Sequence, residues 1–197
     1  MNRKISTDAV SLLDGLLSKD RLSIDAQLNG DSRRLFVQAA LACLGIKEVG
    51  KNGGEEVTLF QKTVGLNAGD AWCMCFVQTC LAYAELKTKK PSPLVASGAC
   101  MAVWVGAGEV QRVKHIPLAG AVAIWQHTSD SGHGHTGIVL NCDGVSFHAI
   151  EGNTSKGYAD LQGRVGQGDG VRYTHRRFDL FNPERGDMQL RGFIKPF

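Results

Sequence analysis

Three cysteines lie within eight residues of one another, at positions 73, 75 and 80. A cysteine can act as a nucleophile when its thiol pKa is lowered, a base lies nearby and hydrogen-bond donors await the oxyanion. The first turn of a helix supplies the lowered pKa and the donors, because its backbone N–H groups are unpaired and carry the positive end of the helix dipole. Asp70 is a favourable N-cap, so the pattern predicts a helix from Ala71 to about Leu86 with Cys73 in its first turn. We predict that Cys73 is a catalytic nucleophile; the alternative is that it only begins the apolar stripe of this helix.

A base for this thiol should come from a separate element that folds against the start of the helix. The run Gly132 to Val139, GHGHTGIV, places His135 at the entrance of a predicted strand, and glycines there let another backbone or a substrate approach closely. We expect His133 to lie exposed on the preceding loop and His148 to have a structural role within a strand. The other three histidines have no supporting sequence context. His135 is therefore the predicted base.

The imidazole also needs an acceptor that fixes its tautomer and orientation. The dipeptide Asp143-Gly144 is a hairpin signal between two predicted strands. His135 and Glu151 are equally far from Asp143 in the sequence, so a hairpin centred there would place them opposite each other, with Cβ atoms about 4.5–5.5 Å apart. This register predicts that Glu151 orients His135; the alternative is that Glu151 is an exposed acid at the end of a strand.

The elements that must position these residues change in type along the chain. Apolar residues at helical spacing predict helices around Leu13, behind Ser32 with Phe36, Ala40 and Leu44 facing inward, and around Phe60, in addition to the helix of Cys73. After Pro117 short runs rich in β-branched and aromatic residues predict strands instead. These strands are Ala121–Trp125, Thr136–Asn141, Ser146–Glu151, Val171–His175 and Leu190–Lys195. Helices followed by strands predict an α+β fold with helices packed on an antiparallel sheet.

Length and composition are those of an ordinary globular protein. The 197 residues are enough for one domain and an extension, and the turn signal Asn29-Gly30-Asp31 predicts a boundary between an N-terminal helical extension, residues 1–30, and a catalytic domain, residues 31–197. The net charge of +3 does not demand an anionic partner, and we interpret the basic residues around Arg176 as a solvated strand face. No CxxC motif, no apolar run of membrane-spanning length and no signal peptide are recognised.

Three motifs occur in an order that resembles the CHAP domain, a branch of the NlpC/P60-like peptidoglycan hydrolases with a papain-like fold. They are GDAWCMCFV at 69–77, GHTGIV at 134–139 and IEGNT at 150–154. The resemblance covers about Asp31 to Phe197, and the segments Glu48–Gly54 and Gly192–Pro196 also look like phage-lysin relatives. It implies N-terminal helices on a five- to six-stranded antiparallel sheet.

The resemblance also implies roles for individual residues. Cys73 would attack an amide carbonyl, His135 would activate the thiol and protonate the leaving amine, and Glu151 would orient the imidazole. Asn153 would orient His135 or stabilise the oxyanion. The expected substrate contacts are Trp72, Asp70 and Trp125.

The implied substrate is the peptide part of bacterial peptidoglycan, cleaved at the N-acetylmuramoyl–L-alanine amide or at a peptide bond. No acidic loop like the calcium site of some relatives precedes Cys73, so we expect no metal and no cofactor. Gly120-Ala121 departs from the Gly-Asp of many relatives, which we expect to alter local hydrogen bonding and not the chemistry. We further expect a monomer, no nucleic acid as partner and no stable membrane insertion.

Several functional hypotheses fit these residues. The leading one is a phage endolysin, made in the cytoplasm and acting on the cell wall after release; a secreted antibacterial effector with the same amidase chemistry is an alternative. A papain-fold acyltransferase or deamidase that acts on protein is a second alternative, because one fold hosts several chemistries. A third is an inactive wall-binding module, against which the joint presence of Cys73, His135, Glu151 and Asn153 argues.

Overall fold

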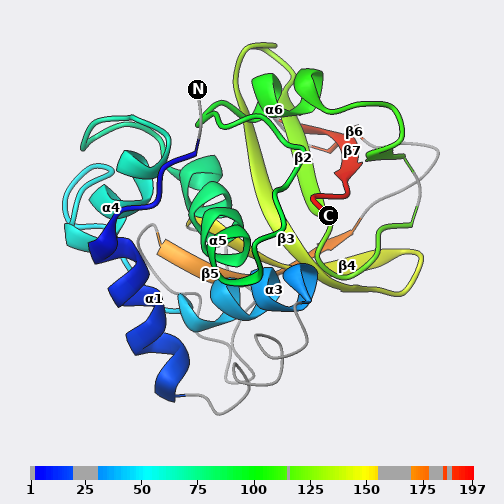
Figure 1. Ribbon diagram of the computed structural model, residues 1–197. Helices are drawn as coiled ribbons and strands as arrows, with labels where there is room; N and C mark the ends of the chain where they lie inside the picture. The colour runs from blue at the N-terminus through cyan, green and yellow to red at the C-terminus, as the bar shows by residue number, and fades with distance from the viewer. Residues whose placement is uncertain (1–2, 20–30, 115, 155–169, 178–183, 186–187) are drawn as a thin grey trace, which may run out of the picture.

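The computed structural model describes residues 3–19, 31–114, 116–154, 170–177, 184–185 and 188–197 (Figure 1). Within these ranges the chain forms helices and one antiparallel sheet, which confirms the predicted α+β class. The strands follow the spatial order β1-β7-β2-β3-β4-β5, and a short strand, β6, pairs with β7. Their bounds are β1 Arg112–Val113, β2 Val122–His127, β3 Gly134–Cys142, β4 Ser146–Thr154, β5 Gly170–Arg177, β6 Glu184–Arg185 and β7 Met188–Ile194.

The five longer strands are those that the sequence pattern predicts, but two short ones, β1 and β6, carry no pattern of their own. A two-residue strand is too short to show alternation, so only its pairing defines it. β1 pairs with β7 through Arg112 and Val113, and β6 pairs with β7 through Glu184 and Arg185.

One helix, α5, lies at the centre of the helical layer. The helices are α1 Thr7–Lys19, α3 Ser32–Ala42, α4 Glu55–Thr63, α5 Cys73–Thr88 and α6 Cys100–Gly106. α3 and α4 pack against α5, and α5 in turn packs on β3 and β4 (Figure 1). Every α5 residue from Cys73 to Ala84 is buried. This explains why the apolar stripe of the sequence is broad: the helix is enclosed on all sides along most of its length.

The first helix is packed into the same core as the rest of the helical layer. Leu13 and Leu17 of α1 belong to the main hydrophobic cluster, and Asp14 accepts hydrogen bonds from the Tyr83 hydroxyl and from Lys87, both on α5. Arg3 forms an ion pair with Glu85 at the far end of α5. Residues 20–30, where the sequence predicts a domain boundary, lie outside the described residues, and the division at residue 30 stays a prediction.

The predicted start and end of α3 are each displaced by a residue or two. Asp31, not Ser32, is the N-cap, and its carboxylate accepts a hydrogen bond from the Arg34 N–H at 3.0 Å. The helix ends at Ala42, so Leu44 lies beyond it and is 41% exposed, contrary to the predicted inward position. The short helix α6 is not predicted, because its apolar run CMAVWVG has no helical period that distinguishes it from a strand.

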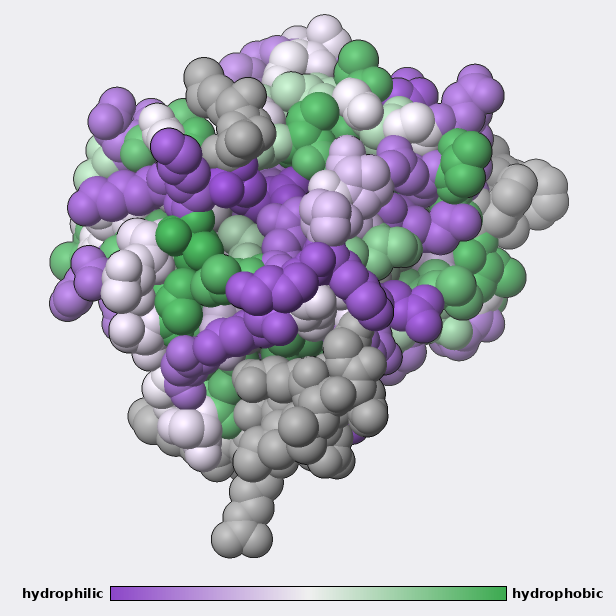
Figure 2. Space-filling model, in the orientation of Figure 1, coloured by the Kyte–Doolittle hydropathy of each residue, from purple (hydrophilic) through white to green (hydrophobic). Residues whose placement is uncertain are grey.

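The surface mixes apolar and hydrophilic residues. Figure 2 shows green and purple residues interspersed over the visible face. The most exposed large apolar side chains lie on separate segments, among them Val49, Val105, Val110 and Leu118. Scattered apolar residues of this kind are common on globular proteins. In the described part of the chain, none of the helices has the length and apolar character needed to span a bilayer.

Candidate active site

Cys73 is the first residue of α5. Trp72 occupies the N-cap position, and the first hydrogen bond of the helix runs from the Phe76 N–H to the Trp72 carbonyl at 3.0 Å. The N–H groups of Cys73, Met74 and Cys75 therefore precede the hydrogen-bonded ladder, at the positive end of the helix dipole. The prediction of a helix start favourable to a thiolate holds, and Cys73 is even closer to the helix end than predicted.

The prediction that Asp70 caps this helix is wrong. The Asp70 carboxylate accepts a hydrogen bond from the Asn67 N–H at 3.0 Å, within the turn before the helix. Its carbonyl accepts a hydrogen bond from the buried Gln61 side chain at 2.6 Å. Asp70 thus stabilises the loop that leads into α5, and the helix begins two residues later than the sequence pattern indicates.

A glycine of β4 lets the start of α5 lie close to the sheet. A Cβ atom at Gly152 would stand 2.8 Å from the Trp72 ring and 2.9 Å from the Cβ of Phe76, closer than packed atoms can approach. The absence of a side chain at Gly152 therefore brings the helix start against β4 directly beside Glu151. This contact places the thiol and the carboxylate in the same small region.

His135 and Glu151 meet, but not through the predicted register. The Nε2 atom of His135 lies 2.9 Å from Oε2 of Glu151, and the two side chains are 12% and 0% exposed. The hairpin turn runs from Asp143 to Ser146, and a bulge follows between Val139 and Asn141. Both features shift the pairing, so that Ile138 lies opposite Ile150.

Continuing that register brings Gly137, not His135, opposite Glu151. A Cβ atom at Gly137 would stand 2.6 Å from Cγ of Glu151, so the glutamate side chain crosses directly over this glycine. The expectation that His135 and Glu151 are directly opposite is therefore wrong by two residues, and their side chains meet along the diagonal of the pair. Long side chains can reach diagonal neighbours in a sheet.

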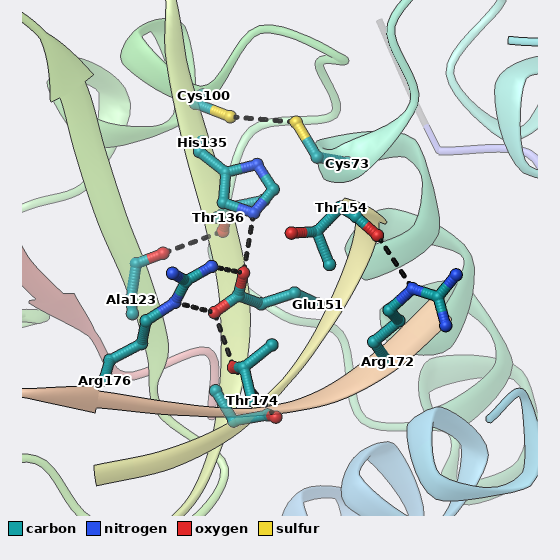
Figure 3. Close-up of polar contacts among 11 residues, drawn as sticks. Cys73, Cys100, Ala123, His135, Thr136, Glu151, Thr154, Arg172, Thr174 and Arg176 are labelled. Atoms are coloured by element: carbon teal, nitrogen blue, oxygen red, sulfur yellow. Dashed lines mark hydrogen bonds and ion pairs between the residues drawn. The ribbon is translucent and has the colours of Figure 1, made fainter. Parts of the chain in front are cut away.

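The buried Glu151 carboxylate is surrounded by donors from β5. It accepts a hydrogen bond from the Thr174 hydroxyl at 2.6 Å and forms a bidentate ion pair with Arg176, whose Nε lies 2.7 Å from Oε1 (Figure 3). The interpretation of the basic residues around Arg176 as a solvated strand face is therefore wrong for Arg176, which pairs with a buried carboxylate. The signal available in the sequence was alternation: Thr174 and Arg176 lie on one face of β5, the face that meets Glu151.

These contacts set the charges of the site. Burial opposes ionisation of Glu151, but hydrogen bonds from Arg176 and His135 outweigh it and hold its pKa at about 2. Burial also opposes the charged form of His135, yet interactions with Cys73 and Glu151 raise its pKa to about 10. The resting site therefore contains a carboxylate and an imidazolium at neutral pH.

The remaining ring nitrogen of His135, Nδ1, points toward Cys73 (Figure 3). The Cys73 thiol is 6% exposed, and its pKa is held well below the ordinary value. The largest cause is a hydrogen bond with Cys100, whose sulfur lies 3.7 Å from that of Cys73; hydrogen bonding and charge from His135 and the Met74 N–H contribute, and burial opposes them. The site thus favours a thiolate beside an imidazolium.

The two cysteines near Cys73 in the sequence face elsewhere. Cys75 donates weakly to the Ala71 carbonyl at 3.6 Å, and burial raises its pKa to about 12. Burial likewise raises the pKa of Cys80. The cysteine that does reach Cys73 is Cys100, at the start of α6. The sequence does not predict this contact, because only the fold brings the two helix starts together.

The other predicted site residues lie at different distances from this centre. Trp125 pairs with His135 across β2 and β3, with ring centroids 5.9 Å apart, and remains a predicted substrate contact. Asn153 adopts a positive φ of 54° near the end of β4; among the described residues no hydrogen bond joins it to His135, and its role stays a prediction. Asp70 is exposed.

Trp72 does not fit a substrate contact. Its side chain is fully buried, packs against Phe60 with centroids 5.9 Å apart, and donates from Nε1 to Glu48 at 3.1 Å. It belongs to the core beneath the start of α5. Its position in the motif beside Cys73 reflects the packing of the helix end.

The two other histidines singled out in the sequence lie as expected. His133 is on the loop before β3, its side chain is 77% exposed, and its Nδ1 atom lies 2.6 Å from the Asp130 carboxylate. His148 lies within β4 with its Nδ1 atom 2.7 Å from the Asn141 side-chain oxygen. In the part of the chain described by the structure, no group of three or more His, Cys, Asp or Glu side chains is arranged to hold a metal ion.

Comparison with known proteins adds one finding to this geometry. The family model of the CHAP domain matches residues 65–153, a span that holds the thiol, the imidazole and the carboxylate described above. Arg176 and Thr174 lie outside the matched span. Neither the curated proteins nor the solved structures contain a match to this chain.

Proposed function

We propose, since residues 65–153 of the chain are a CHAP domain, that this protein is a thiol-dependent peptidoglycan hydrolase. The domain implies amidase or peptidase chemistry, and the proposal assigns that chemistry to Cys73, His135 and Glu151. The observation that carries it is the connected series at the start of α5: a buried thiol, an imidazole that faces it, and a carboxylate 2.9 Å from the second ring nitrogen. This is the arrangement of a nucleophile, its base and an orienting group.

In the proposed mechanism the Cys73 thiolate attacks the carbonyl carbon of an amide in the peptide part of peptidoglycan. A sulfur–carbon bond forms and the carbonyl electrons move to oxygen. In this proposal, N–H groups that precede the first hydrogen bond of α5 stabilise the negative charge on this oxygen, and the helix dipole favours it. The His135 imidazolium then gives its Nδ1 proton to the leaving nitrogen, and the carbon–nitrogen bond breaks.

The thioester is hydrolysed in the second half of the reaction. Neutral His135 removes a proton from a water molecule, which attacks the thioester carbonyl, and Cys73 leaves as a thiolate. Glu151 accepts the Nε2–H of His135 throughout and keeps Nδ1 directed at the reacting atoms. The ion pair with Arg176 keeps Glu151 ionised, so it orients the ring without taking its proton.

Two finer assignments belong to the same proposal. The scissile bond is either the N-acetylmuramoyl–L-alanine amide or a peptide bond in the stem or cross-bridge. The proposed biological role is that of a phage endolysin, which the likeness of Glu48–Gly54 and Gly192–Pro196 to phage-lysin sequences favours over a secreted effector. Cells that contain the protein are then expected to lyse once their membrane is permeabilised; intact walls after permeabilisation would argue against this role.

The central test is clearance of purified cell walls. The wild-type protein is expected to clear them, and Cys73→Ala and His135→Ala are expected to lose about 10⁴-fold or more and about 10²–10⁴-fold in rate, respectively. Cys142→Ser is the matched control, because Cys142 is a free, half-buried thiol at the far end of β3. Normal clearance by both active-site variants would refute the assignment of the nucleophile and base.

Mass analysis of the released muropeptides decides among the remaining chemistries. A lactyl carboxylate freed from muramic acid marks the amidase, and a new amine within the peptide marks the endopeptidase. If walls yield no new fragments while a protein substrate is deamidated or acylated, the alternative of a papain-fold acyltransferase or deamidase replaces the proposal.

A further inference from the structure

Cys100 lies at a point where three elements of the site converge. It is the first residue of α6, its sulfur is 3.7 Å from that of Cys73 at the start of α5, and it is 4% exposed. A Cβ atom at Gly134, the residue before His135, would stand 3.5 Å from the Cβ of Cys100. Cys100 is therefore packed between the nucleophile and the strand that carries the base (Figure 3).

We propose that Cys100 is a catalytic residue that stays protonated and donates its S–H to the Cys73 thiolate. This inference rests on the proposed function in one respect, namely that Cys73 is the nucleophile. The contact is 3.7 Å long, within hydrogen-bonding distance for sulfur, and both thiols are shielded from water that would otherwise solvate a thiolate. A buried anion needs hydrogen-bond donors. The Cys100 S–H, at the start of α6, is a side-chain donor within reach of the Cys73 sulfur.

The ionisable groups around Cys73 agree on which sulfur carries the proton. His135 faces Cys73 from β3 and favours the Cys73 thiolate. Cys75 lies on the same helix turn, and burial raises its pKa, so it stays protonated. The pKa of Cys100 is raised well above its ordinary value, by the hydrogen bond with Cys73 first and by burial second, whereas the pKa of Cys73 is lowered. The shared proton therefore stays on Cys100, and the negative charge stays on Cys73.

The test is the pH dependence of alkylation of Cys73 by iodoacetamide, with the modified peptide measured by mass spectrometry and no wall substrate present. Only the thiolate reacts, so the rate falls as the pH drops through the thiol pKa. Cys100→Ala removes the donor and is expected to raise the apparent pKa of Cys73 by about one unit, which lowers the alkylation rate below that pKa about tenfold. Cys100→Ser keeps a donor of nearly the same size and is expected to retain most of the wild-type profile.

Two further variants protect this test from a purely structural explanation. Cys80→Ala removes another buried thiol of α5, one that contacts Cys43, and is expected to leave the profile of Cys73 unchanged. Cys100→Val fills the space without a donor, so it replaces the alanine variant if that variant does not fold.

The outcomes separate this inference from the proposed function. If Cys73 of the wild-type protein reacts no faster than Cys75 and Cys80 at neutral pH, the assignment of the nucleophile fails. If Cys73 reacts rapidly but the profiles of Cys100→Ala or Cys100→Val coincide with that of the wild type, Cys100 only fills space and the inference is wrong. If Cys100→Ser raised the apparent pKa of Cys73 as much as Cys100→Ala does, the inference would also be wrong.

Discussion

Helix α5 carries two buried thiols that each face a second thiol, yet their surroundings drive their pKa values in opposite directions. Cys73 contacts Cys100 at the start of the helix, and its pKa is lowered. Cys80 lies about two turns further along, contacts Cys43, and its pKa is raised, first by burial and then by that contact. The amino acids are identical, so the difference comes from what else surrounds each pair.

Three surroundings distinguish the first pair from the second. The start of α5 offers backbone N–H groups that precede the helical hydrogen bonds, whereas at Cys80 the neighbouring N–H groups are used within the helix. His135 supplies a positive charge beside Cys73, and Glu151 keeps that charge in place. A buried thiol becomes a nucleophile only where donors and a cation outweigh the cost of burying its charge.

Among the groups that surround the two thiol pairs, Glu151 is expected to have the largest effect on activity and stability when its charge is removed. Glu151→Gln preserves the size of the side chain but leaves Arg176 without its ion pair and His135 without a carboxylate. We expect kcat/KM for wall hydrolysis to fall about 10²-fold, and the free energy of unfolding to fall by about 3 kcal/mol because a buried charge loses its partner. Clearance assays and urea titration measure the two effects.

The control for this substitution is Glu48→Gln. Glu48 accepts a hydrogen bond from the Trp72 ring and does not belong to the proposed series of Cys73, His135 and Glu151. A glutamine can accept the same hydrogen bond, so activity should be retained.

The pH dependence of stability gives a second check on Glu151. Glu151 has a pKa of about 2 in the folded protein against an ordinary value of 4.5, so its contribution to stability is complete above about pH 4.5 and disappears as the pH falls toward 2. The Glu151→Gln variant should lose this pH-dependent part of the free energy of unfolding. If its acid unfolding curve matched that of the wild type, Glu151 would not have the lowered pKa described above.

A smaller effect is expected from a methyl group placed under Glu151. The Cβ of Gly137→Ala would lie 2.6 Å from Cγ of Glu151, so the carboxylate must move away from His135. Because small displacements of a positioning group slow catalysis, we expect kcat/KM to fall about tenfold. In the control Gly15→Ala, the new methyl group has no neighbour within 4 Å on helix α1, and helix propensity predicts about 1 kcal/mol of stabilisation with unchanged activity. Equal activity of the two variants would show that Glu151 need not hold its present position.

The smallest effect on activity is expected from the second thiol pair. Cys80→Ala removes one buried sulfur from the core without changing the start of α5, so kcat/KM should stay within about twofold of the wild-type value. The free energy of unfolding should fall by about 1 kcal/mol through lost apolar burial. Urea titration and wall clearance on the same preparation test this prediction. A loss of activity as large as that caused by Glu151→Gln would mean that the two pairs do not differ in function as their surroundings indicate.

Much of the fold follows from local sequence pattern. The apolar stripe of α5, the helix around Leu13 and the hairpin signal at Asp143-Gly144 each predict an element that the structure contains. The motifs around Cys73, His135 and Glu151 also point to a thiol, a base and an acid in one site. Local propensity and periodicity suffice for these features, because each depends on residues close together in the chain.

What the sequence alone determined, then, is the type of each element and the chemistry that its side chains can offer. Tertiary structure alone decided how these side chains meet and which further side chains join them. The bulge after Val139 shifts the register, Gly137 and Gly152 permit the close approaches, and β5 brings Arg176 to the buried carboxylate. Cys100 reaches Cys73 only because the first residues of α5 and α6 lie next to each other. Such contacts join residues far apart in the chain, and their geometry depends on how whole elements pack, which no local pattern encodes.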